Sequence, residues 1–69
     1  MDQNERRRAV TKFIRITAKG DHVTVELVED VFGRERVQQR SVYRTLEAAR
    51  AAARTLSRQN GGCAVRELK

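Results

Sequence analysis

Arginines at four-residue intervals are the first residues in this chain that could do chemistry. Arg50, Arg54 and Arg58 recur through an alanine-rich run, and residues 34–58 carry seven basic and two acidic side chains. The guanidinium group is a planar fork of donors that makes paired hydrogen bonds with phosphates and base edges. The charge pattern therefore predicts a nucleic acid, DNA or RNA, as the leading partner.

Few other residues of this chain could act in catalysis or bind a metal. The single cysteine, Cys63, can form no disulfide within the chain and, with only one histidine, no zinc site. We expect Cys63 to be a small buried residue and His22 to be exposed beside a turn. No two side chains are spaced for acid–base or nucleophilic work, so we expect a non-enzymatic protein without a cofactor or metal.

Composition indicates one small folded domain. The chain has 69 residues, of which 39% are apolar and 35% charged, and it contains no proline. We predict a flexible basic arm over residues 1–9 and a single domain over residues 10–69. No apolar stretch is long enough to span a membrane and no secretory signal is present, so we expect a cytoplasmic protein with no membrane partner.

The first two strands are predicted from alternating hydrophobicity. In residues 10–18, Val10, Ile14, Ile16 and Ala18 fall on one face, and Phe13, Arg15 and Thr17 on the other. Lys19-Gly20-Asp21 is typical of a tight hairpin turn. The next segment, 22–29, turns Val23, Val25 and Leu27 toward the same core.

A loop and a third strand follow. Val31 and Phe32 are unusually apolar for a loop that ends at Gly33, so they either fold back on the sheet or meet a protein partner. The third strand is predicted within residues 34–44 and is polar on both faces. We place Val37, Gln39, Ser41 and Tyr43 inward, beside an alanine-rich helix, and the other set, Arg36, Gln38, Arg40 and Val42, outward.

A helix and a last strand complete the domain. Thr45 is the expected N-cap, and Gly61 the left-handed residue after a helix that ends near Gln59 or Asn60. The core stripe consists of Leu46, Ala49, Ala52, Ala53 and Leu56. A short edge strand is predicted in "CAVREL". The expected fold is a two-layer α+β domain with an antiparallel sheet of three to four strands and one helix, in the order β-β-β-α-β.

The strand-to-helix junction "SVYRTLEAARAAARTL" resembles three kinds of domain. The first comprises small bacterial strand-helix-strand domains without known activity, whose pattern is matched by Tyr43, Thr45, Glu47, Ala48, Ala52, Ala53 and Gly61. The second is the three-stranded DNA-binding domain of tyrosine-type integrases, which lays its open sheet face into the major groove; this resemblance implicates Arg15, Arg36 and Arg40. The last helix also resembles that of double-stranded-RNA-binding domains, but the paired lysines of that family fall on Thr45 and Leu46 here.

Two hypotheses follow for the site. In the first, nucleic acid contacts the outward face of the sheet and the arm, through Arg7, Arg8, Arg15, Arg36, Gln38 and Arg40. The helix row of Arg50, Arg54 and Arg58 is a secondary candidate for phosphate contacts, because helix geometry alone explains its spacing.

In the second hypothesis, the chain is a protein-interaction module. Phe13, Val31 and Phe32 then mediate binding to a partner or formation of a homodimer, and the arginines serve solubility.

Overall fold

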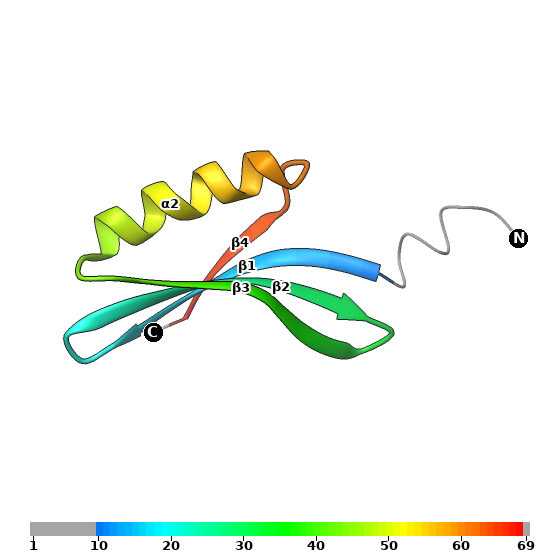
Figure 1. Cartoon of the computed structure of the whole chain (residues 1–69), viewed down its shortest axis with the longest axis horizontal. Coiled ribbons are helices and arrows are strands. Elements are labelled where there is room, and N and C mark those ends of the chain that lie inside the picture. Colours follow the sequence, from blue (N-terminus) through cyan, green and yellow to red (C-terminus); the bar gives the residue numbers. More distant parts are fainter. Residues whose placement is uncertain (1–9, 69) are drawn as a thin grey trace, which may run out of the picture.

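The computed structural model describes residues 10–68, which form a four-stranded sheet with one helix on one face (Figure 1). The elements are β1 (Val10–Lys19), β2 (His22–Val31), β3 (Arg34–Tyr43), α2 (Leu46–Gln59) and β4 (Ala64–Leu68). The predicted α+β class and element order are confirmed. The arm predicted over residues 1–9 lies outside the described residues.

The sheet is mixed rather than wholly antiparallel. Its strand order is β3-β2-β1-β4, with antiparallel pairing of β1 to β2 and of β2 to β3. The chain crosses through α2 from β3 to the far side of β1, where β4 pairs parallel to β1. The predicted edge position of the last strand is confirmed, and β3 forms the opposite edge.

The first hairpin sets the pairing between β1 and β2. Lys19 pairs with His22, so the chain reverses through Gly20 and Asp21 alone. Gly20 has a φ of 55°, which glycine adopts without a steric penalty. The same register places Arg15 directly opposite Glu26.

The second hairpin also turns through two residues. Val31 pairs with Arg34, and the intervening Phe32 and Gly33 have φ values of 51° and 85°. Two successive positive φ angles suit the right-handed twist of the flanking strands. The side chain of Asp30 accepts a hydrogen bond from the Gly33 N–H at 2.8 Å. The tip of this hairpin extends beyond the end of α2 (Figure 1).

A bulge interrupts β3 between the two halves of the strand. Gln39 pairs with Leu27 and Val37 pairs with Val28, so Gln38 is the extra residue. An extra residue reverses the side-chain alternation that follows it. Val37 therefore shares the face of Val28, which is directed away from α2, and the prediction that it points inward is wrong.

The same bulge places two of the predicted site residues on the face of the sheet opposite to the predicted one. Arg36 pairs with Glu29, and Glu29 lies on the same face of β2 as the residues that pack against α2. The Gln38 side-chain amide donates to Glu29 Oε1 at 3.3 Å, so it too is directed to that side. The predicted placement of Arg36 and Gln38 on the open face, the face not covered by α2, is wrong because the pattern gave no sign of the bulge.

The boundaries of α2 agree with the predicted capping residues. The Thr45 hydroxyl accepts a hydrogen bond from the Ala48 N–H at 3.1 Å. At the other end the Gly62 N–H donates to the Ser57 carbonyl at 2.8 Å, and Gly61 has a φ of 75°.

The main core lies between α2 and strands β1 and β2. Ala49 and Ala53 are fully buried, which lets the helix approach the sheet closely. The buried cluster comprises Ile14, Ile16, Val23, Val25, Leu27, Ala49 and Ala53, with Tyr43, Leu46, Leu56 and Cys63 packed against it. The predicted core positions are confirmed for Leu46, Ala49, Ala53 and Leu56 of the helix stripe and for Ile14, Ile16, Val23, Val25 and Leu27 of β1 and β2. Ala18 is exposed, and Ala52 is half-buried outside this cluster. The open face therefore carries the remaining side chains of β1 and β2.

Candidate nucleic-acid interface

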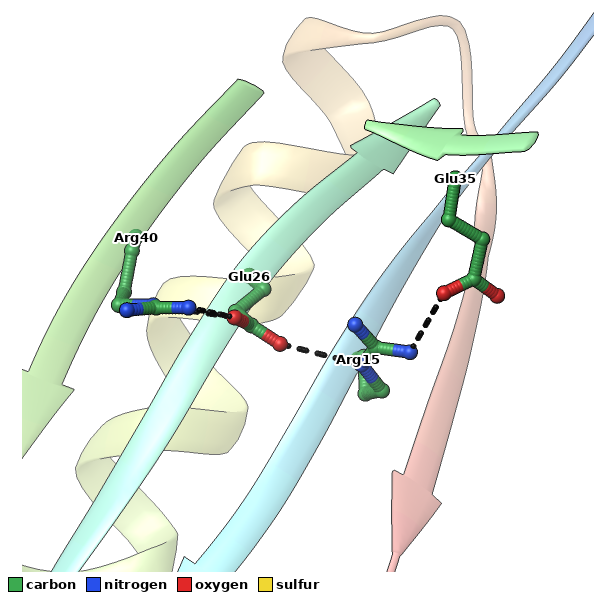
Figure 2. A network of polar contacts seen from close by, with 4 residues as sticks. All are labelled: Arg15, Glu26, Glu35 and Arg40. Carbon is green, nitrogen blue, oxygen red and sulfur yellow. Dashed lines mark hydrogen bonds and ion pairs between the residues drawn. The ribbon is translucent and has the colours of Figure 1, made fainter. Parts of the chain in front are cut away.

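A row of charged side chains crosses the middle of the open face. Arg15 on β1, Glu26 on β2 and Arg40 on β3 are successive cross-strand partners. Glu26 accepts hydrogen bonds from Arg15 Nε at 3.0 Å and from Arg40 Nη2 and Nε at 2.7 and 3.0 Å (Figure 2). One carboxylate thus neutralises part of the charge of two arginines.

Glu26 is the only charged residue buried between residues 10 and 68, with 8% of its surface exposed. Burial by itself raises the pKa of a carboxyl group because it disfavours the charged form. Hydrogen bonds from Arg40 and Arg15 outweigh that effect, so the pKa of Glu26 lies below its usual value. The carboxylate remains ionised and holds both arginines in place.

Arg15 has a second carboxylate partner, which shows how the sheet curves. Its Nη1 donates to Glu35 Oε1 at 3.1 Å, although Glu35 belongs to β3 and β2 lies between β3 and β1. The first part of β3 must therefore bend over the open face to reach Arg15 (Figure 2). Hydrogen bonds to Glu26 and Glu35 raise the pKa of Arg15. Arg15 therefore stabilises the fold, and any ligand must compete with two carboxylates for its guanidinium group.

Phe13 lies on the predicted face but is not exposed. Its residue surface is 5% exposed, and the Arg66 guanidinium carbon lies 4.2 Å from the centre of its ring. Its cross-strand neighbour Val28 is fully buried. Phe13 and Val28 thus form a small apolar cluster on the open face, and Phe13 is not available to stack on a base or to contact a partner.

A polar hollow lies at the other end of the open face. Its volume is about 460 Å³, and it is lined by Arg15, Thr17, Lys19, His22, Thr24, Glu26, Arg40 and Val42. Lys19, Arg15 and Arg40 contribute positive charge and only Glu26 contributes negative charge. An anion of phosphate size would meet donors from three strands there. His22, expected to be exposed, is half-buried and lies 3.2 Å from the Asp21 carboxylate.

A line of arginines follows the edge strand. Arg34, Arg36, Arg40 and Arg44, together called the cationic edge, are all exposed along β3 and the residue after it. Arg34 and Arg36 form no ion pair with any residue from 10 to 68. Arg40 is bound to Glu26, yet 62% of its side chain remains exposed. Arg34 was not predicted as a site residue, although the predicted alternation of β3 places it on the same face as Arg36.

The three arginines of the helix row differ in their ion pairing. Arg50 Nη2 binds Glu67 of β4 at 2.7 Å, so this arginine connects the helix to the edge of the sheet. Arg54 and Arg58 are exposed and make no ion pair within the described part of the chain. Arg7 and Arg8, the candidates in the arm, lie outside the described residues.

The predicted protein-interaction residues differ in exposure. Val31 ends β2 and is half-buried, whereas Phe32 at the hairpin tip is 78% exposed. Val37 and Val42 of β3 are 44% and 62% exposed. Three exposed apolar residues thus lie along β3 and the turn before it, and two others, Val65 and Leu68, lie on β4 at the opposite edge.

The Arg15–Glu26–Arg40 row was missed, although one sequence signal could have revealed it. A two-residue turn at Gly20-Asp21 fixes the register of the first hairpin, and counting back from it places Arg15 opposite Glu26. The contact of Arg15 with Glu35 had no such signal, because it depends on the curvature of β3.

Comparisons with known proteins add no family to these observations. No model of a protein family, no curated protein and no solved structure matches the chain. Within residues 10–68, no helix has the length and apolar character needed to cross a membrane.

Proposed function

We propose that this chain is a non-enzymatic protein that binds nucleic acid along the cationic edge. The observation that carries the proposal is the exposure of four arginines along β3 and the residue after it. Three of them, Arg34, Arg36 and Arg44, have no carboxylate partner within residues 10–68. Exposed, uncompensated arginines retain their full charge for phosphate.

The dimensions of the edge suit a linear polyanion. A strand rises about 3.3 Å per residue, so Arg34 and Arg44 are separated by roughly 30 Å along β3. A single compact anion cannot contact both ends of such a line, whereas successive phosphates of one polymer can. Contacts with phosphate position the polymer without reading its sequence, so we expect DNA and RNA both to bind.

The hollow on the open face extends this surface. Arg40 belongs to both the edge and the hollow, and Lys19 adds a second exposed cation beside it. We assign Arg15 the role of positioning Glu26 and, through it, Arg40, because Arg15 is engaged by two carboxylates. The predicted contact residues Arg36 and Arg40 are retained in this proposal, and Arg34 and Arg44 are added to them.

The test compares two double variants with the same change of charge. Arg34→Ala with Arg36→Ala removes two arginines from the cationic edge, and Arg54→Ala with Arg58→Ala removes two from the helix. Binding to mixed-sequence single-stranded and duplex oligonucleotides is measured by fluorescence anisotropy at several salt concentrations. The edge variant is expected to bind more weakly, with a slope of log K against log salt that is smaller by about two.

The control separates the edge from net charge. The helix variant should keep the affinity and salt slope of the wild type, because its arginines lie on α2 rather than on the edge. Equal weakening of both variants would mean that total charge alone is responsible. Absence of binding to any oligonucleotide at low salt would refute the proposal.

Self-association is the second candidate function, favoured by Val37 and Val42, which are exposed on β3, an edge strand of the sheet formed by residues 10–68. Such an edge can add a strand from another chain. The arginines on the same strand oppose pairing between two identical copies, so we rank this candidate lower. It predicts a mass that rises with concentration and is insensitive to nucleic acid.

A further inference from the structure

Phe32 is the one aromatic residue between positions 10 and 68 that is mostly exposed. The other two aromatics are engaged, since Phe13 is buried under Arg66 and Tyr43 packs against the main core. Phe32 is 78% exposed at the tip of the β2–β3 hairpin, beyond the end of α2 (Figure 1). A large apolar ring is thus displayed at the extremity of the sheet.

The backbone conformation of Phe32 makes an exposed aromatic residue at this position more unusual. Its φ of 51° lies in the left-handed region, where glycine, asparagine and aspartate are the usual residues and bulky side chains are rare. Turn geometry alone would favour one of those small residues. An aromatic residue at this position therefore lacks an explanation in the folding of the hairpin.

The surroundings of the ring indicate which ligand it would accept. A hollow of about 320 Å³ lies beside it, lined by Val31, Phe32, Arg34 and Arg36. Both arginines are exposed and form no ion pair with another residue of the described range. An apolar wall next to two free guanidinium groups suits a group that is flat and apolar on its faces and attached to a phosphate.

We propose that Phe32 stacks on an unpaired base of a nucleic acid strand whose phosphates are bound by Arg34 and Arg36. This inference rests on the proposed function and specifies its ligand as single-stranded or locally unpaired nucleic acid. An exposed ring can reach a base face only where the base is not already stacked between two neighbours. The hairpin tip would then mark one end of the strand that follows the cationic edge.

The test replaces Phe32 and compares ligands with and without bases. Phe32→Ala should weaken binding of oligo-dT and oligo-U by roughly 5- to 100-fold, the range expected for loss of one stacked base. The same variant should bind inorganic polyphosphate, which has charge but no bases, as the wild type does. Arg34→Ala with Arg36→Ala should weaken binding of both kinds of ligand.

A spectroscopic variant reports stacking directly. The chain has no tryptophan, so Phe32→Trp introduces a single indole at the tip. Its emission should be quenched by oligo-dT and unchanged by polyphosphate at equal saturation. Phe32→Gly, which suits the positive φ, provides a folded variant without a ring and should share the loss of affinity seen for Phe32→Ala.

The outcomes separate this inference from the proposed function. Oligonucleotide binding that depends on Arg34 and Arg36 but not on Phe32 would overturn the stacking and leave the cationic edge intact. Equal losses for oligo-dT and polyphosphate in Phe32→Ala would also overturn it, since the ring would then act only through the shape of the hairpin. Failure of every polyanion to bind would overturn both.

Discussion

Glu26 changes the interpretation of the arginines around it. A carboxylate in the middle of a mostly polar strand face looks like one acidic group among several, but its burial and two arginine partners make it the centre of the open face. Arg15 and Arg40 would repel one another without it. The charge of these arginines is therefore first a structural property, and only what remains exposed on Arg40 serves a ligand.

Replacing Glu26 should make the fold less stable and less sensitive to acid. Because the folded-state pKa is depressed, the ionised carboxylate stabilises the fold above its unfolded pKa, and this contribution is lost as pH falls through the folded pKa. Glu26→Gln should lower the free energy of unfolding by about 2 kcal/mol at pH 7, between the values for exposed and buried pairs. The difference from wild type should shrink below about pH 4. Urea denaturation across pH measures it.

Glu47→Gln is the matched control for that measurement. Glu47 is exposed in the first turn of α2 and makes no ion pair within residues 10–68, so its loss should cost about 0.5 kcal/mol through the helix dipole. Parallel stability curves for wild type and Glu26→Gln from pH 7 to pH 3 would contradict a depressed pKa at Glu26.

At the scale of the element, the stability of α2 depends on its N-cap, Thr45. Thr45→Ala leaves the Ala48 N–H without its side-chain acceptor and should lower the free energy of unfolding by about 1 kcal/mol. Thr45→Ser keeps the hydroxyl group and should stay within about 0.5 kcal/mol of wild type. Thermal or urea unfolding followed by circular dichroism checks both, and an equal loss in the two variants would assign the effect to the threonine methyl group instead.

Turns, caps and helices that depend on residues close in sequence could be predicted, whereas the bulge and the curvature of β3 could not. The Gly20 turn, the Thr45 cap and the helix stripe each follow from residues that are adjacent in sequence. The bulge at Gln38 does not, because glutamine is compatible with either face, and the register of β3 was decided by the distant turn at Phe32-Gly33. Arg36 was consequently assigned to the wrong face.

Burial on the open face escaped prediction for the same physical reason. Alternation correctly placed Phe13 opposite the main core, but it cannot indicate that a neighbouring segment covers a face. The curved start of β3 brings Glu35 to Arg15, and Arg66 of β4 lies on the Phe13 ring. Contacts between strands that are distant in sequence therefore produced a second, smaller apolar cluster.

At the scale of the whole molecule, the acidic groups are mostly used internally. Glu26 and Glu35 bind arginines, Glu67 binds Arg50, and Asp30 caps the second turn. Within residues 10–68, the positive charge that has no acidic partner is consequently carried by exposed arginines and lysines. Arg34, Arg36 and Arg44 belong to the cationic edge, where they attract a polyanion and repel a second cationic edge, whereas Arg54 and Arg58 lie on α2 and Arg66 on β4.

This distribution predicts how the chain assembles. Antiparallel pairing of two β3 strands would bring the cationic edge of one copy beside that of the other, and like charges close together destabilise a sheet. The wild type should therefore have the mass of one chain in light scattering at low salt. Arg34→Thr with Arg36→Thr should raise self-association and lower affinity for oligonucleotides. The reason is that these two arginines oppose strand pairing between copies and also bind phosphates. A wild-type dimer that persists from low to high salt would show that the exposed valines outweigh the charge and would favour the protein-interaction function.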